Sequence, residues 1–204
     1  MKDRGAFIVL EGIDGSGKTT QAKLLAKKLE KNHRALYTAE PSDNRIGLFI
    51  RNACLYEEKR LLPDVEALLF AADRVEHVEN EIKPALKEGR LVICDRYIHS
   101  SLAYQGSANL SLSWIKAINK DALKPDLAVF IDVSPETVLK RLERRKSVME
   151  NLDTQQRVRE IYLSFVENGE LIRIDGEKPP SQVFEALLAT IQKWLKGFQE
   201  DLVS

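Results

Sequence analysis

Short apolar runs alternate along this chain with longer stretches in which apolar residues recur at helical spacing. The apolar runs predict five strands, at residues 6–10, 35–38, 90–94, 127–131 and 171–174, of which 35–38 has the weakest pattern. Because a helical stretch separates most of these runs, the pattern favours parallel strands joined by crossover helices, which is an α/β fold.

The helical stretches are equally regular. Four apolar residues between 22 and 29 fall on one helix face, and residues 63–86 form a long helical stretch that we expect to be split or bent near Pro84. Ser134, Pro135 and Glu136 are typical of a helix start. Apolar residues from 183 to 198 form one stripe, which we interpret as core packing.

Polar clusters follow the predicted strands, at residues 11–20, 40–51, 95–106 and from Asp132 onward. Ligands of open parallel sheets bind beyond the carboxyl ends of the strands. The clusters therefore indicate one shared site at that edge.

The first cluster reads GIDGSGKT and matches the P-loop pattern G-x-x-x-x-G-K-[ST]. Its glycines let main-chain N–H groups surround a phosphate, while Lys18 bridges the β- and γ-phosphates of ATP and Thr19 holds Mg²⁺. The alternative is a turn that only caps a helix, but chance produces this pattern in about 1% of chains of this length. We expect the nucleotide to be bound by Gly12, Ile13, Asp14, Gly15, Ser16, Gly17, Lys18, Thr19 and Thr20.

A second charged group, Asp95 and Arg96, follows the strand at 90–94. A carboxylate here lies near the P-loop in a doubly wound sheet, so Asp95 is a candidate second magnesium ligand. The guanidinium of Arg96 offers a permanently charged fork to a phosphate. The alternative is an ion pair that merely closes a strand end.

Several segments together resemble the thymidylate kinase family. They are KTTQ at 18–21, LFAADR at 69–74, DRYIHSSLAYQG at 95–106, KPDL at 124–127 and IDVSPE at 131–136. The resemblance implies a three-layer, doubly wound parallel sheet, the P-loop NTPase fold of nucleoside monophosphate kinases. It also implies transfer of the terminal phosphoryl group of ATP to dTMP, which gives the dTDP needed for dTTP synthesis.

The resemblance also assigns the acceptor pocket. Phe70 would stack on thymine, Arg74 would donate to the thymine O4 carbonyl, and Ser101, Tyr104 and Gln105 would line the pocket for base and sugar. The local pattern alone favours the interpretation of Phe70 as a core aromatic residue. Arg74 likewise reads as an exposed helix arginine paired with a nearby glutamate.

Two features concern the acceptor phosphate and sugar. Asp14 would accept from the 3′-hydroxyl or position the acceptor phosphate. Many family members carry an arginine soon after a proline in the segment that follows the second strand, whereas here 40–45 reads EPSDNR. Arg45 or Arg51 could substitute for it, and the sequence does not choose between them.

The charge that stabilises the moving phosphoryl group is expected from a lid. Gly15 stands where some family members carry a basic residue, so the chain resembles the lid-arginine subgroup. We expect a short lid around 141–153 to supply Arg144 or Arg145, from a basic group that also contains Arg141 and Lys146. The alternative is a solvated basic helix end.

Composition limits the remaining classes. The chain has 204 residues, 44% of them hydrophobic, with no linker or repeat, so we expect one domain over 1–204. Its net charge of +0 argues against extended nucleic-acid binding, and no apolar run is long enough to span a membrane. Cys54 and Cys94 lack a disulfide or metal pattern, which favours a reducing, cytoplasmic compartment.

Other functions stay open at this point. They are a kinase with broader nucleotide or deoxynucleoside specificity, and a non-catalytic P-loop binding module. The family resemblance also implies a homodimer, with the helical region 63–86 as the expected contact.

Overall fold

The structure, a computed structural model, describes residues 4–52, 61–141 and 152–203. Within these residues, the strands predicted from the apolar runs are all present and form one parallel sheet in the order β2-β3-β1-β4-β5. Its strands are β1 (Ala6–Glu11), β2 (Leu36–Ala39), β3 (Leu91–Asp95), β4 (Leu127–Asp132) and β5 (Ile172–Asp175).

Burial differs between the middle and the edges of this sheet. Every residue of β1, β3 and β4 is buried, whereas β2 and β5 each have a single buried residue. Strands covered on both faces need continuous apolar runs, which explains the clear sequence signal of the central strands. The weaker pattern at 35–38 belongs to an edge strand.

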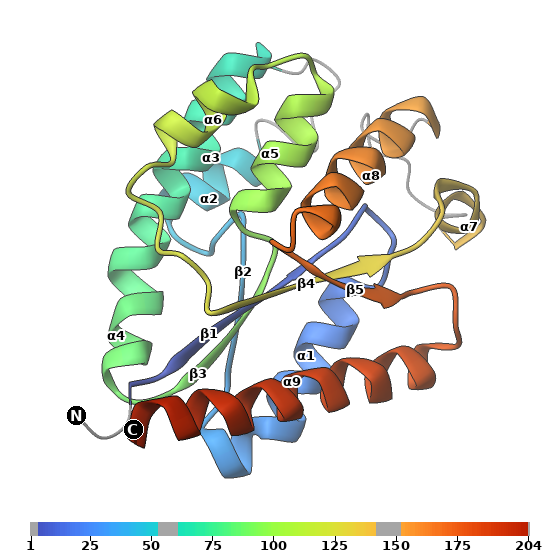
Figure 1. The fold of residues 1–204 in the computed structure, drawn as a ribbon. Helices are drawn as coiled ribbons and strands as arrows, with labels where there is room; N and C mark the ends of the chain where they lie inside the picture. The colour runs from blue at the N-terminus through green and yellow to red at the C-terminus, as the bar shows by residue number, and fades with distance from the viewer. Residues whose placement is uncertain (1–3, 53–60, 142–151, 204) are drawn as a thin grey trace.

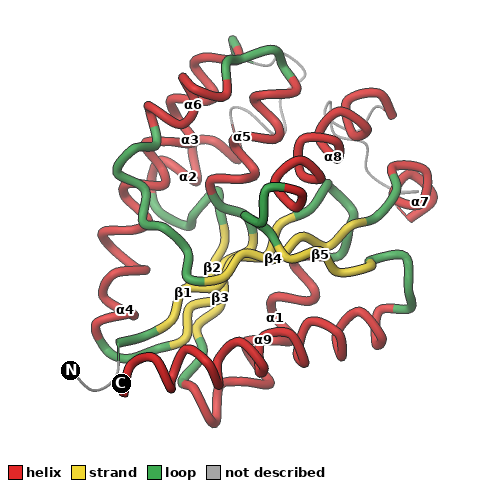
Figure 2. Tube along the Cα trace, viewed as in Figure 1, coloured by secondary structure: helices red, strands yellow, loops and turns green. Residues whose placement is uncertain are grey.

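Helices cover both faces of the sheet, so the predicted three-layer arrangement is confirmed (Figure 1). On one face lie α1 (Lys18–His33) and α9 (Pro180–Val203), which contact each other. Figure 2 shows the strands as a single layer between these two helices and the helices above it. The helices above it include α2 (Arg45–Ile50), α5 (Ile98–Ser107), α6 (Leu112–Ile118) and α8 (Leu152–Glu167).

The long helical stretch is divided as its sequence predicts. It consists of α3 (Pro63–His77), a π-helical turn at Val78–Ile82 and α4 (Lys83–Lys87). Pro84 stands in the first turn of α4, where a missing N–H costs little. The break therefore lies next to Pro84.

Two further helix predictions are confirmed. The predicted helix start at Ser134 precedes α7 (Pro135–Arg141). The hydroxyl of Ser134 accepts a hydrogen bond of 3.3 Å from the main-chain N–H of Thr137. In α9 the predicted apolar stripe packs into the core, with Val183, Leu187, Leu188, Ile191 and Leu195 buried. Within the described residues, no helix has both the length and the apolar character required to cross a membrane.

The register of the sheet brings the functional segments together. Leu10 of β1 pairs with Asp95 of β3, and Glu11 pairs with Phe130 of β4. The carboxyl ends of these three strands therefore meet at one edge, where the loops of the next section begin.

Candidate active site

The P-loop connects β1 to α1, and its glycines are needed for two different reasons. Gly15 and Gly17 have φ values of 78° and 91°, a region that favours glycine, and Gly17 caps the start of α1. A Cβ atom on Gly12 would lie 2.9 Å from the carbonyl oxygen of Ile131 and 2.7 Å from the hydroxyl of Ser16. Glycine at this position lets the loop lie directly on the end of β4.

Lys18 is the first residue of α1, and its side chain folds back into the P-loop. Its buried ammonium donates to the carbonyl oxygen of Ile13 at 2.8 Å. Burial, with the positive charge of Arg96 added, lowers the pKa of Lys18 to about 8. A bound polyphosphate would place further negative charge beside this ammonium group.

The predicted magnesium ligands lie side by side. The hydroxyl of Thr19, in the first turn of α1, donates to Oδ2 of Asp95 at the end of β3. The other oxygen, Asp95 Oδ1, is buried, and no described residue forms a hydrogen bond with it. A hydroxyl and a carboxylate are hard oxygen ligands, and Mg²⁺ uses few protein ligands together with phosphate and water oxygens. The residues present therefore fit Mg²⁺.

Arg96, Asp14 and Tyr104 form one cluster beside the P-loop. The guanidinium of Arg96 forms an ion pair with Asp14 and also donates to the hydroxyl of Tyr104 at 3.2 Å. The same hydroxyl accepts the main-chain N–H of Asp14 at 2.9 Å, and the guanidinium carbon lies 4.9 Å from the centre of the Tyr104 ring. The structure thus places the predicted phosphate-binding arginine against the nucleotide cradle.

The charges within this cluster keep Asp14 ionised. Burial raises the pKa of Asp14, but the positive charges of Arg96 and Lys18 outweigh burial, and the pKa lies below its usual value. Asp14 is therefore an acceptor, as required of a group that orients a hydroxyl or an arginine.

Glu11 is a buried residue of this site to which sequence reasoning assigned no role. Its carboxylate accepts the main-chain N–H groups of Tyr97 at 3.0 Å and Ser100 at 3.3 Å. It also accepts the hydroxyls of Ser100 at 2.7 Å and of Tyr162, from α8, at 2.9 Å. Glu11 thus fixes the start of α5 against β1. The signal was present, because Glu11 ends an apolar strand as Asp95 and Asp132 do.

The acceptor side is built around Arg74 of α3, which is only 2% exposed. Its guanidinium donates to Glu40 at 2.6 Å, to Ser101 at 3.1 Å and to the side-chain oxygen of Asn119. The alternative of an exposed arginine paired with a neighbouring helix glutamate is therefore wrong. Arg74 Nε is buried and has no hydrogen-bond partner in the described part of the chain, where one donor of the group is therefore unused.

Gln105 presents the complementary polar atom. It lies one helical turn after Ser101 on the same face of α5, and its buried Oε1 has no hydrogen-bond partner within residues 4–52, 61–141 and 152–203. Phe70 of α3 is half-buried rather than enclosed in the core, which leaves part of its ring accessible. An unused donor and an unused acceptor thus stand among the residues predicted to bind the base.

Glu40, the acid that precedes Pro41 in the segment EPSDNR, supports Arg74. It is buried at the end of β2, paired with Arg74 and 3.3 Å from Nδ1 of His77. Nε2 of His77 lies 2.7 Å from the hydroxyl of Thr38 and 3.4 Å from Glu81. Burial lowers the pKa of His77, but the bonds to Glu40 and Glu81 outweigh it and raise the pKa to about 9. A protonated histidine thus supports the carboxylate that holds Arg74.

The two arginines proposed for the acceptor phosphate differ in placement. Arg51 forms a 2.6 Å ion pair with Asp43 and also donates to the carbonyl oxygen of Pro41, in the loop that follows β2. Arg45, at the start of α2, is exposed. The structure therefore shows Arg51 bound to the loop by its side chain, whereas Arg45 is exposed.

The expected lid residues Arg144, Arg145 and Lys146 lie outside the described residues. Arg141, which ends α7, donates to the carbonyl oxygen of Gly176 at 3.2 Å. On α8, Arg159 binds both oxygens of Asp132, at 2.7 and 3.1 Å, where β4 ends.

The geometry of this site is enough to define a class of enzyme. A P-loop shares its sheet edge with a hydroxyl and a carboxylate that fit Mg²⁺, with the partly buried Arg96 and with the buried Arg74, which is the arrangement of a P-loop phosphotransferase.

Comparison with known proteins narrows the class to one family. The family model described as "Thymidylate kinase" matches residues 10–187. A "Probable thymidylate kinase" of Pyrococcus horikoshii is 49% identical over 172 residues, covering 80% of this chain and 84% of that protein. One from Pyrococcus abyssi is 44% identical over 203 residues, covering 95% and 99%. A "Thymidylate kinase" of Caldanaerobacter subterraneus is 40% identical over 204 residues, covering 95% and 98%. The chain belongs to the thymidylate kinase family.

Proposed function

We propose that this protein transfers the terminal phosphoryl group of ATP to the 5′-phosphate of dTMP, giving dTDP and ADP. The observation that carries the proposal is the position of Arg96, which joins the P-loop residue Asp14 to Tyr104 of the predicted sugar pocket. An arginine there faces the junction between a donor in the P-loop and an acceptor on α5. Membership of the family supports the same reaction.

The donor is held by the P-loop. Main-chain N–H groups between Gly12 and Thr20 surround the phosphates, and Lys18 neutralises their charge. Thr19 and Asp95 would hold Mg²⁺, which, when bound, stabilises negative charge on the phosphate oxygens.

The acceptor is held by Arg96 and, in this proposal, by Arg51 rather than Arg45. An oxygen of the acceptor phosphate attacks the terminal phosphorus, and the bond to the bridging oxygen of ADP breaks in line. This reaction depends on positioning and charge, because a phosphate oxygen is an adequate nucleophile without a general base. Arg144 or Arg145 would cover the moving group, as part of a lid around 141–153 on a single domain of residues 1–204.

The base would be selected by the unused polar atoms of the pocket. Arg74 Nε is a donor that suits the O4 carbonyl of thymine, and Gln105 Oε1 is an acceptor that suits the N3–H group. Cytosine presents an amino donor and a ring-nitrogen acceptor at these places and would leave both protein atoms unpaired. Phe70 would stack on the ring, and Ser101 would hold Arg74 in position.

The proposal includes a homodimer in the cytoplasm. Large apolar side chains are exposed on α2 and α3, namely Leu48, Phe49, Val65, Leu68 and Val75. An exposed apolar surface of this kind is typical of an interface, and a second copy of the chain is the occupant that the family resemblance implies. Cys94 is a buried free thiol, which suits a reducing compartment.

A coupled assay of ADP release tests this function. It compares dTMP with thymidine, dUMP, dCMP, dGMP and AMP as acceptors. We expect strong stimulation by dTMP and none by thymidine, which lacks the phosphate that Arg96 would bind. ADP release that is independent of any acceptor would indicate a P-loop module that hydrolyses ATP, and equal rates with all monophosphates would indicate a broad nucleotide kinase.

A further inference from the structure

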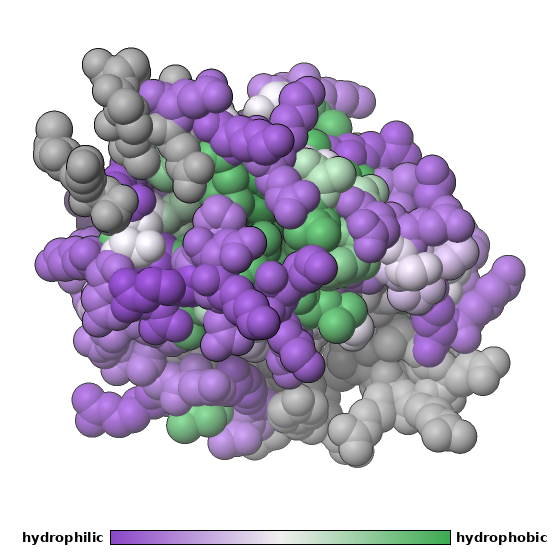
Figure 3. Space-filling model, turned by 90° about the horizontal axis from the view of Figure 1, so that it is seen from below, coloured by the Kyte–Doolittle hydropathy of each residue, from purple (hydrophilic) through white to green (hydrophobic). Residues whose placement is uncertain are grey.

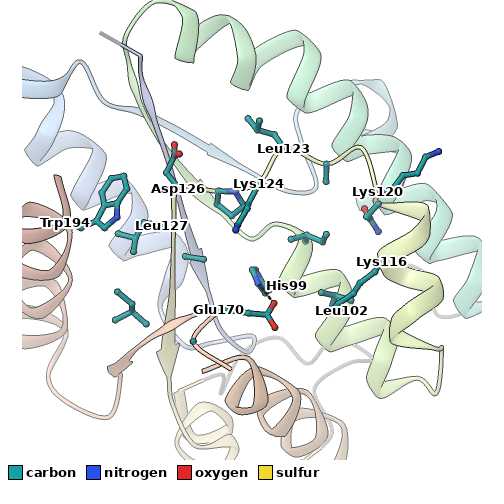
Figure 4. A pocket seen from close by; sticks show the side chains of 17 residues that line it. His99, Leu102, Lys116, Lys120, Leu123, Lys124, Asp126, Leu127, Glu170 and Trp194 are labelled. Carbon is teal, nitrogen blue, oxygen red and sulfur yellow. Dashed lines mark ion pairs between the residues drawn. The ribbon is translucent and has the colours of Figure 1, made fainter. Parts of the chain in front are cut away.

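A second cavity, of about 690 Å³, lies on a different face of α5 from the residues of the active site. Its lining comes from α5, the segment between α6 and β4, the turn before β5, and α9 (Figure 4). On α5 it is lined by Ile98, His99 and Leu102, whereas Ser101 and Tyr104 of the same helix contact Arg74 and Arg96. Its volume is within the range of about 300–1,000 Å³ that is typical of ligand sites.

His99 is an unsatisfied polar group in the wall of this cavity. It is 7% exposed, and its buried Nδ1 has no hydrogen-bond partner among the residues that the structure describes. Its Nε2 lies 3.8 Å from Glu170, too far for a hydrogen bond. Leaving a buried polar group without a hydrogen-bond partner is unfavourable. A ligand that approaches the ring would recover part of this cost.

The charges around the cavity favour an anion. Lys116, Lys120 and Lys124 contribute to its lining, and none of the three forms an ion pair with any residue that the structure describes. The lining also contains two acids, Asp126 and Glu170. Asp126 is already paired with Arg4 and accepts the main-chain N–H of Phe7. Figure 4 shows Lys124 extending into the cavity, whereas Lys120 points away from it.

The remaining wall is apolar and partly aromatic. Leu102, Leu123, Leu127 and Trp194 lie on it, and Trp194 is stacked on Phe198 at 4.7 Å. A flat ring packs well against such a wall, and the polar edge of a ring can meet His99 or Asn119. The cavity thus combines a surface for a ring with cations for a phosphate.

We propose that this cavity binds a phosphorylated nucleoside, with its phosphates between Lys116 and Lys124 and its base against Leu123 and Trp194. It is separate from the P-loop and from the predicted acceptor pocket.

The cavity has a direct connection to the acceptor pocket. Asn119 lines the cavity, and its side-chain oxygen accepts a hydrogen bond from Arg74. A ligand that displaces Asn119 or α5 changes the position of Arg74 and of Ser101, so it changes the KM for dTMP. This consequence rests on the proposed function, and by linkage dTMP must alter the affinity of the cavity by the factor by which the ligand alters the Kd for dTMP.

Trp194 provides the test of binding. The chain contains two tryptophans, so the Trp114→Phe variant leaves Trp194 as its single tryptophan reporter. In this background we expect dTTP and ATP to change the Trp194 emission, with affinity at least tenfold weaker in a Lys116→Ala/Lys124→Ala variant. A Lys27→Ala/Lys28→Ala variant on the exposed face of α1 is the matched control and should bind as tightly as its parent.

Each alternative outcome overturns the proposal. In the first, neither dTTP nor ATP changes the Trp194 emission. In the second, the Lys116→Ala/Lys124→Ala variant binds them as tightly as its parent. In the third, inorganic triphosphate alone has the same effect as the nucleotides. The emission titration needs no catalysis, so it reports on the cavity even where no dTMP is phosphorylated. If the ligand binds in the cavity but leaves the KM for dTMP unchanged, the coupling between the two sites is wrong and the binding site stands.

Discussion

Arg96 has a φ of 71°, a left-handed conformation that non-glycine residues adopt at a cost of about 1–3 kcal/mol. Its main-chain N–H donates to the carbonyl oxygen of Leu10 at 3.0 Å, which fixes the turn at the end of β3. The turn directs the guanidinium back over the P-loop, toward Asp14. Strain at this position is consistent with a role in positioning phosphate.

Replacing Arg96 by lysine tests this role. Lysine keeps the charge but cannot bridge Asp14, Tyr104 and a phosphate with one planar group. We expect the Arg96→Lys variant to lose at least about 100-fold in kcat/KM for dTMP, while the affinity for ATP changes little. Arg90→Lys, at the opposite end of β3, is the matched control. Steady-state kinetics with each substrate varied would contradict this role if both variants behaved alike.

His77 makes a second prediction, which concerns stability. A histidine whose pKa rises from 6.5 to about 9 on folding contributes stability below pH 6.5, and this contribution is lost as the pH rises through 9. We expect His77→Gln to be less stable than the parent by up to about 3 kcal/mol at pH 6, with the difference disappearing by pH 10.

Chemical unfolding of both proteins at several pH values measures that difference. Subtracting the variant from the parent removes the contributions of other groups, such as Lys18, whose lowered pKa acts in the opposite direction. His33→Gln, at the end of α1, is the control. A difference independent of pH would mean that His77 is uncharged in the folded protein.

At the scale of elements, local signals made most of the fold predictable. The P-loop, the strands and the start of α7 each depend on neighbouring residues, so the sequence contained their full pattern. The partners of Arg74 could not be predicted in this way, because Glu40 and Asn119 come from distant segments that only the folded sheet brings together. For the same reason, the pattern of α3 alone could not show that Arg74 is buried.

Gly12 gives a prediction about the contact between the P-loop and β4. A Cβ atom there would contact the carbonyl oxygen of Ile131, which the sheet holds in place, so the P-loop backbone must move instead. We expect Gly12→Ala to weaken ATP binding at least about tenfold with little change in helix content. Calorimetry and circular dichroism measure the two effects.

Gly197 is the matched glycine. It lies in α9, and a Cβ atom there would meet nothing within 4 Å. Alanine favours a helix more than glycine does, so Gly197→Ala should raise stability by about 0.5–1 kcal/mol and leave ATP binding unchanged. Normal ATP affinity in Gly12→Ala would show that the loop tolerates a side chain and that its close approach to β4 is not required.

At the scale of the whole molecule, the exposed surfaces differ in character. Figure 3 views the molecule from the side of α9, where hydrophilic side chains surround a smaller hydrophobic area. On α3, by contrast, Val65, Leu68 and Val75 are 40%, 50% and 53% exposed at helical spacing, and α2 adds Leu48 and Phe49 beside them. Phe70 and Arg74 also belong to α3, so association through this helix would support the acceptor pocket.

A charge in the centre of this surface tests the dimer. Leu68 is half exposed in the monomer, so Leu68→Glu should fold normally, but a dimer would have to bury the new carboxylate twice around a twofold axis. We expect light scattering to report a dimer for the parent and a monomer for this variant at micromolar concentration. Leu24→Glu, at a similarly exposed leucine on α1, should remain dimeric. If both variants kept the parent mass, the two copies would associate through another surface, and if the parent were itself a monomer, α3 would have to be covered by something other than a second copy.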